Sequence, residues 1–115
     1  MRTLHFGLRV ADRDQSLAFY AALGYEVVGS VPGTGLGHLT MIKLPGDDFV
    51  AIELVHDPDR DAVPGPGLSH FVIHVPALET TLARLAARGI AVEDPESPDG
   101  SADFRTTWVL SLIHI

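Results

Sequence analysis

The chain has 115 residues, a formal net charge of −7 and no cysteine. Hydrophobic residues make up 46% and charged residues 20%, a balance typical of one globular domain with a packed core. The negative charge argues against a nucleic-acid or anionic-membrane partner, because no basic stripe exists to neutralise phosphates. Without cysteine, disulfides and thiolate metal sites are excluded, so any metal would need His, Asp or Glu. No segment reaches the roughly 18 apolar residues of a membrane span, and we expect a cytoplasmic protein.

The first predicted element is a strand in the stretch TLHFGLRVA, which alternates as a strand with one buried face does. Its apolar face comprises Leu4, Phe6, Leu8 and Val10, and its other face comprises His5, Gly7 and Arg9. A helix is predicted next, with Asp12 as its N-cap, Gln15 three residues on and Gly24 as its stop. The predicted buried stripe of this helix is Leu17, Tyr20, Ala21 and Leu23.

Three more strands are predicted before a linker. The first runs from Tyr25 to Val31, and a Gly/Pro loop, PGTGLG, leads to the second, from His38 to Leu44. The turn PGDD then closes a hairpin onto Phe49 to His56. Residues 1–56 therefore form a predicted βαβββ module, and the polar, breaker-rich residues 57–67 are its predicted linker.

The chain repeats itself at an offset of 65 residues. Nine of the 23 positions from His5 to Val27 are identical to those 65 residues later, including His5/His70, Phe6/Phe71 and Gly24/Gly89. Residues 68–115 are therefore predicted to form a second module. Its predicted elements are a strand over Leu68–Pro76, a helix with the stripe Leu78, Leu82, Leu85 and Ala86 that stops at Gly89, and strands over Ile90–Asp94 and Phe104–Leu110.

The unusual polar residues of these strands are His5, Glu53 and His70. Glu53 lies in the apolar run FVAIELVH, where a carboxylate is costly unless it is paired, bound to a cation or turned toward water. Taken singly, each residue fits an ordinary solvated or hydrogen-bonded side chain. The repeat changes this, because two modules packed about a pseudo-twofold axis would bring both imidazoles and the carboxylate together. His74 shares the parity of His70 and could support a metal ligand, face the substrate or lie at the surface. His38 and His56 are predicted to be solvent or loop histidines.

The segments LHFGLRVADRDQSLAFYAALGYEV, AIEL and LSHFVIHV resemble the vicinal oxygen chelate superfamily of glyoxalases, bleomycin-resistance proteins and ring-cleaving dioxygenases. The resemblance covers residues 1 to about 109. It implies an α+β fold in which two tandem βαβββ modules form a cupped mixed sheet with helices outside. Among its members the chain looks most like lactoylglutathione lyase (glyoxalase I). That family uses a His and a Glu from each module, and the first three ligands fall on His5, Glu53 and His70.

The fourth ligand of that family has no counterpart here. Glu53 plus 65 is position 118, beyond the last residue, and TTWV is followed by LSLIHI with neither a turn signal nor a carboxylate. We therefore expect the last strand of the second module to be missing or replaced. One hypothesis is that LSLIHI is translated from adapter DNA of a sequencing library. The alternative is a natural short paralogue whose tail forms a different strand, with His114 as an unfavoured ligand.

The resemblance implies a divalent metal (Zn, Ni, Mn or Fe) that stabilises an enediolate, with Glu53 as the base that moves a proton between adjacent carbons. The substrate would be the hemithioacetal of a 2-oxoaldehyde and a thiol. Alternatives are an Fe(II) ring-cleaving dioxygenase, a metal-dependent enzyme that opens an epoxide antibiotic, and a metal-free drug-binding protein. In the last, Tyr25, Phe104 and Trp108 could stack on the drug, although core packing suits them too. By resemblance the chain is expected to form a homodimer with a small-molecule substrate.

Overall fold

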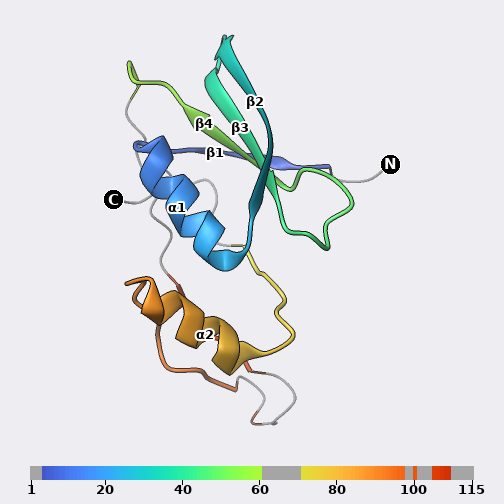
Figure 1. Cartoon of the computed structure of the whole chain (residues 1–115), viewed down its shortest axis with the longest axis vertical. Coiled ribbons are helices and arrows are strands. Elements are labelled where there is room, and N and C mark those ends of the chain that lie inside the picture. The colour runs from blue at the N-terminus through green and yellow to red at the C-terminus, as the bar shows by residue number, and fades with distance from the viewer. Residues whose placement is uncertain (1–3, 61–70, 98–99, 101–104, 110–115) are drawn as a thin grey trace. The chain divides into compact units, whose positions relative to one another are not determined.

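The structure is a computed structural model that describes residues 4–60, 71–97, 100 and 105–109 (Figure 1). These residues fall into two compact units, which are taken separately below. The first unit contains β1 (Phe6–Arg9), α1 (Arg13–Leu23), β2 (Glu26–Thr34), β3 (Gly37–Lys43) and β4 (Ile52–His56), and the second contains α2 (Leu78–Ala87). Within the described residues, no helix is both long and apolar enough to cross a membrane. The predicted α+β class is confirmed.

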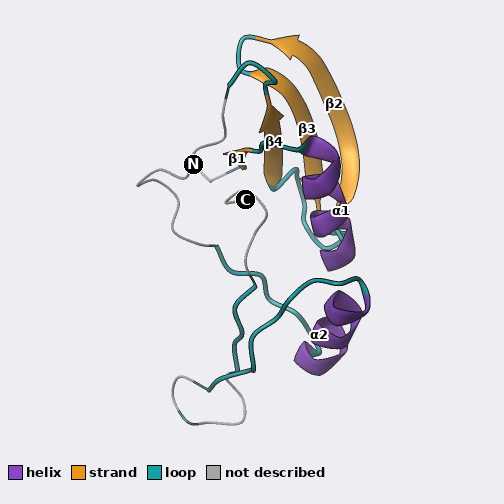
Figure 2. Cartoon of the chain, turned by 90° about the vertical axis from the view of Figure 1, so that its left-hand side faces the viewer, coloured by secondary structure: helices purple, strands orange, loops and turns teal. Residues whose placement is uncertain are grey.

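The first unit is built on one mixed, curved sheet with the strand order β1-β4-β3-β2 (Figure 2). β1 runs parallel to β4, with Gly7 opposite Glu53, and the other neighbours are antiparallel. The parallel pair requires a crossover, and α1 with the β2–β3 hairpin supplies it. The predicted βαβββ order of this module is thereby confirmed.

Alternation along the two parallel strands creates the core of this unit. Leu8 and Val10 on β1 and just beyond it are 4% and 1% exposed, and Ile52 and Leu54 on β4 are 1% and 0% exposed. α1 packs on this face and contributes the buried rings of Phe19 and Tyr20. Each fully buried side chain of this size stabilises the fold by about 1.5–3 kcal/mol. The sheet face under α1 is therefore the apolar one.

The two ends of α1 match the prediction, but its predicted buried stripe is partly wrong. The Asp12 side chain accepts a hydrogen bond from the Gln15 backbone N–H at 3.0 Å, and Gly24 ends the helix at φ 104°. The residues actually buried are Ser16, Phe19, Tyr20 and Ala22, whereas Leu17 is half-buried and Ala21 is exposed. The Tyr20 ring meets those of Phe19 and Tyr25 edge to face, with centroids 5.1 and 5.5 Å away. This aromatic packing determines which side of α1 is buried.

The β2–β3 hairpin is longer than predicted, and β4 is shorter. The segment PGTGLG was expected to be a loop, but β2 continues to Thr34 and only Gly35 and Leu36 form the turn. Thr34 Oγ1 donates to the Gly37 carbonyl at 2.5 Å and secures this turn. β4 begins at Ile52 instead of Phe49, because the segment after the PGDD turn pairs only through single hydrogen bonds such as Ala51 N–H to Ile42 O, 3.2 Å.

In its described residues, the second unit contains the predicted helix but no continuous strand. α2 spans Leu78–Ala87, buries Leu85 and is followed by Gly89 at φ 77°. Within residues 71–97 and 105–109, the strand-like contacts are an isolated antiparallel bridge between Glu96 and Thr106 and a backbone hydrogen bond from Glu93 N–H to the Trp108 carbonyl, 3.3 Å. Phe71, Ile73 and Val75 are half-buried while Val72 and His74 between them are exposed, so the predicted alternation is present although residues 71–76 form no strand. Parts of the predicted strands Leu68–Pro76 and Phe104–Leu110, and the LSLIHI tail, lie outside the described residues.

Two glycines of the hairpin provide a matched test of backbone constraint. Gly33 has φ 70° and open space where a Cβ would lie, whereas Gly37 has φ 118° and a Cβ there would lie 2.6 Å from the His56 carbonyl oxygen. Gly33→Ala should lower the free energy of unfolding by about 1 kcal/mol, the usual cost of a left-handed alanine. Gly37→Ala should cost at least about 2 kcal/mol, because strain and a backbone clash add. Urea unfolding measures both, and equal losses would contradict this account of the hairpin.

Tyr25 provides a test of burial at alkaline pH. Burial, with a contribution from the Asp47 carboxylate, raises the pKa of Tyr25 from 10.0 to about 12. Because the folded pKa lies above the unfolded one, the stabilisation is complete below pH 10 and is lost as the pH rises from 10 toward 12. Tyr25→Phe should reduce this alkaline loss by about 1.3 kcal/mol at most, as measured by urea unfolding at pH 9 and 11. Wild type and variant losing the same stability over this interval would contradict the assignment.

Candidate active site on the sheet face opposite the first helix

His5 and Glu53 meet on the face of the sheet that α1 does not cover. His5 Nε2 lies 3.0 Å from Glu53 Oε2, and the two side chains are 35% and 16% exposed. Glu53 stands between the buried Ile52 and Leu54, so alternation turns it to the opposite face. His5 is two residues before Gly7, which is the register partner of Glu53, and therefore reaches the same face. Parallel pairing of two distant strands thus creates the contact.

The spacing of this imidazole nitrogen and carboxylate oxygen suits two ligands of one divalent cation. Ligand atoms about 2.0–2.2 Å from one tetrahedral ion lie roughly 3.3 Å apart, close to the spacing seen here. Among the residues that the structure describes, no group of three His, Cys, Asp or Glu side chains is arranged to hold a metal. His70, the predicted third ligand, lies outside the described residues, and His74 is exposed in the second unit.

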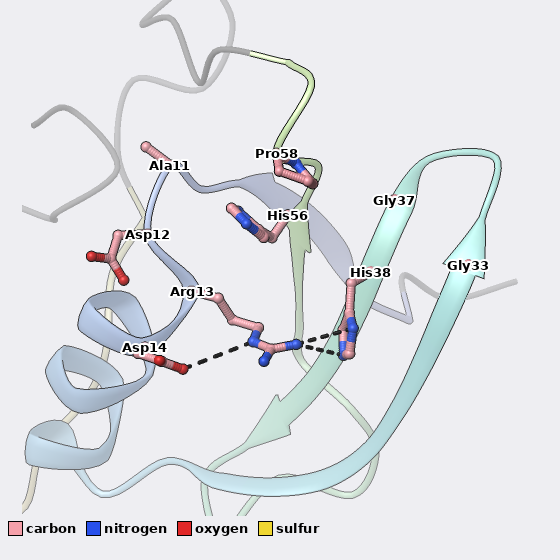
Figure 3. A pocket seen from close by; sticks show the side chains of 9 residues that line it. All are labelled: Ala11, Asp12, Arg13, Asp14, Gly33, Gly37, His38, His56 and Pro58. Carbon is pink, nitrogen blue, oxygen red and sulfur yellow. Dashed lines mark hydrogen bonds and ion pairs between the residues drawn. The ribbon is translucent and has the colours of Figure 1, made fainter.

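A second polar cluster lies on the α1 side of the same sheet, around a cavity of about 580 Å³ (Figure 3). His38 on β3 and His56 on β4 are register partners. Both are half-buried strand residues, so the prediction that they are solvent or loop histidines was wrong. Arg13 joins them from the first residue of α1, with its Nη1 3.0 Å from His38 Nδ1. The lining is completed by Ala11, Asp12, Asp14, Gly33, Gly37 and Pro58.

The chain matches the model of the glyoxalase/bleomycin resistance protein/dioxygenase superfamily over residues 2–107. The chain belongs to this superfamily. The resemblance to the vicinal oxygen chelate superfamily is therefore confirmed at the level of the superfamily. No curated protein sequence matches the chain.

Solved structures share the superfamily fold. One is a glyoxalase/bleomycin resistance protein from Streptomyces sp. CB03234, with 21% identity, 98% of this chain and 94% of that chain covered, and a TM-score of 0.70. TnmS3, an antibiotic binding protein from the same organism, has 23% identity, coverage of 86% and 80%, and a TM-score of 0.67. A variant of the fosfomycin resistance protein FosX from Listeria monocytogenes, complexed with Mn(II) and 1S,2S-dihydroxypropylphosphonic acid, has 15% identity, coverage of 98% and 86%, and a TM-score of 0.73.

In this superfamily chain, sequence reasoning found the His5 and Glu53 pair but missed the Arg13, His38 and His56 cluster. The pair carried two signals, namely a carboxylate inside an apolar run and a histidine repeated 65 residues later. The cluster carried one signal that was not used. His38 and His56 share the parity of Ile42 and Leu54, so the alternation of their own strands placed them under α1.

Proposed function

We propose that the chain is a metal-dependent lyase or isomerase of the glyoxalase type that acts on the hemithioacetal of a 2-oxoaldehyde and a thiol. The observation that carries this proposal is the 3.0 Å contact between His5 Nε2 and Glu53 Oε2 on the sheet face opposite α1. An imidazole nitrogen and a carboxylate oxygen suit Zn, Ni, Mn or Fe(II). FosX, which shares the fold, is complexed with Mn(II), and this supports a divalent cation here. His70 would be the third ligand.

A divalent cation held by His5 and Glu53 would polarise the two neighbouring oxygens of the substrate and stabilise the negative charge that develops on them. Glu53 then acts as the base. Its carboxylate takes the proton from the carbon beside the carbonyl and returns it to the adjacent carbon, so the reaction is an isomerisation without net proton change. Without the cation the His5 contact orders this carboxylate, and Gly7 opposite Glu53 leaves the strand surface beside it without a side chain.

Arg9 adds a positive charge to the same face. It lies two residues beyond Gly7 on β1, opposite Val55 of β4, and is half-buried. Its Nη1 donates only a long hydrogen bond, 3.5 Å, to the Leu36 carbonyl, so other guanidinium N–H groups remain for a ligand. This arrangement favours a thiol that carries a carboxylate, such as glutathione, over a neutral thiol.

His70, the proposed third ligand, can come from the same chain or from a second copy, and we include a homodimer in the proposal. Dilution that separates the two copies should then lower the specific activity only if the modules are exchanged between chains.

One observation favours a second candidate, a metal-free antibiotic-binding protein. His5 and Glu53 already contact each other directly, so the carboxylate has a partner without any cation. TnmS3, which shares the fold, is an antibiotic binding protein, and this supports the candidate. In such a protein the pair would hold the sheet surface in shape and the bound molecule would undergo no reaction.

Metal titration and turnover of the hemithioacetal of methylglyoxal and glutathione separate the two candidates. For the enzyme, wild-type protein stripped with EDTA should regain activity with Ni²⁺, Zn²⁺ or Mn²⁺. His5→Ala should weaken metal binding by at least roughly 10- to 100-fold, the loss that removing only the hydrogen-bond partner of a metal ligand already causes. Glu53→Gln should lower kcat by about 10²–10⁴, since it removes the base.

His74→Ala is the matched control, because this exposed histidine belongs to the second unit and should leave metal binding and turnover unchanged. Unfolding by urea confirms that each variant is folded. If the wild-type protein takes up no divalent metal and His5→Ala binds it as wild type does, the enzyme proposal is wrong. Binding of an antibiotic without turnover, unchanged by EDTA, would then support the second candidate.

A further inference from the structure

The cavity beside α1 is separate from the His5 and Glu53 site. It lies where the parallel strands β1 and β4 end, between the first turn of α1 and the β2–β3 hairpin (Figure 3). Strand parity places its two histidines on the face that α1 covers, opposite the face that carries Glu53. A ligand here would therefore bind independently of the proposed metal site.

Contacts with the His38 ring position Arg13. Its Nη1 lies 3.0 Å from His38 Nδ1 and 2.9 Å from His38 Nε2, and it donates to whichever of these nitrogens carries the lone pair. The Ser30 hydroxyl oxygen lies 2.6 Å from His38 Nε2 and 3.3 Å from the Leu39 carbonyl oxygen. A guanidinium has five N–H donors. Among the described residues, the only other partner of Arg13 is the Asp14 carboxylate, 4.0 Å from its Nε, so donors remain for a ligand.

His56 offers the complementary group. Its Nδ1 lies 3.2 Å from the Val10 carbonyl oxygen, which can only accept, so Nδ1 carries the proton. In the neutral ring Nε2 is therefore a lone-pair acceptor, and no donor reaches it within residues 4–60. Figure 3 shows this ring, the His38 ring and the Arg13 guanidinium around the same space. A ligand that fills this space must accept hydrogen bonds from Arg13 and share a proton with His56.

We propose that this cavity binds a phosphoryl group, as a phosphate monoester or as inorganic phosphate. A phosphate with one remaining acidic proton carries both required functions, since its anionic oxygens accept from Arg13 and its P–OH donates to His56. The volume of about 580 Å³ exceeds that of a phosphate and leaves room for a small organic group. Gly33 and Gly37 line the hairpin side without side chains, and at Gly37 the nearby His56 carbonyl excludes one.

Two carboxylates near the cavity reduce the affinity without blocking the site. Asp12 already accepts the Gln15 backbone N–H as the cap of α1. The Asp14 side chain is 92% exposed, so water screens its charge. Removing that charge should strengthen binding of an anion and would weaken binding of a cation, which makes Asp14→Asn an informative variant.

The test is an NMR titration of the full ¹⁵N-labelled chain at pH 6.5 with inorganic phosphate, glycerol phosphate and sulfate. Phosphate should shift the Arg13 Nε–H and His56 imidazole signals and should bind at least fivefold more tightly than sulfate, which has no proton to donate. Arg13→Gln should weaken phosphate binding roughly tenfold or more, as loss of charge-assisted hydrogen bonds does. His56→Ala should remove the preference for phosphate over sulfate, and Asp14→Asn should strengthen binding of both anions. Tighter binding of glycerol phosphate would identify an ester as the ligand, and equal binding would identify the free anion.

Arg88→Gln and His74→Ala are the matched controls, because both residues are exposed in the second unit. His5→Ala separates this proposal from the proposed enzyme, since it should leave phosphate binding intact while it weakens metal binding. Amide spectra establish that each variant is folded. Equal loss of phosphate binding in Arg13→Gln and Arg88→Gln, or sulfate binding as tightly as phosphate, would overturn the proposal.

Discussion

The parallel pairing of β1 with β4 determines where the chemistry of this chain can lie. Its register sets Gly7 opposite Glu53 and Leu8 opposite Leu54. Because side chains alternate, the same register that brings Leu8 and Leu54 under α1 sends Glu53 to the opposite face to meet His5. A slip by one residue would move Glu53 beneath α1, where an unpaired carboxylate costs several kcal/mol. The apolar core therefore selects the register, and the register assembles the candidate site.

The sequence was most informative where a residue has one local role. Asp12 and Gly24 mark the ends of α1 because capping and left-handed geometry depend on neighbours within a turn. The buried side of α1 depended on tertiary packing of Tyr20 against Tyr25, which no helical period reveals, so Ala21 was wrongly assigned to the core. The length of the β2–β3 hairpin was mispredicted for a related reason. A Gly/Pro-rich segment suggests a loop, but pairing with β3 extends β2 through it.

The same division applies to the polar residues. His5 and Glu53 were predictable together because the internal repeat and the apolar run around Glu53 are both properties of the sequence. His38 and His56 each look like an isolated histidine until the β3–β4 register makes them neighbours. Arg13 reaches them because the cap at Asp12 makes Arg13 the first residue of α1. Thus the two faces of one sheet hold two clusters, and the second follows from pairing that sequence alone does not specify.

The contact between His5 and Glu53 is a starting point for either proposed function. A carboxylate with 16% of its side chain exposed needs a partner, and the imidazole meets that need without a cation. A metal ion must therefore replace this contact, and it gains from donors that are already ordered, since little side-chain entropy remains to be lost. Two protein donors alone leave a cation with mostly water ligands. The third donor therefore decides whether His5 and Glu53 hold a metal ion or share a proton in a hydrogen bond. Without a third donor, the pair would instead form a charge-neutral part of the surface on which the second proposed function depends.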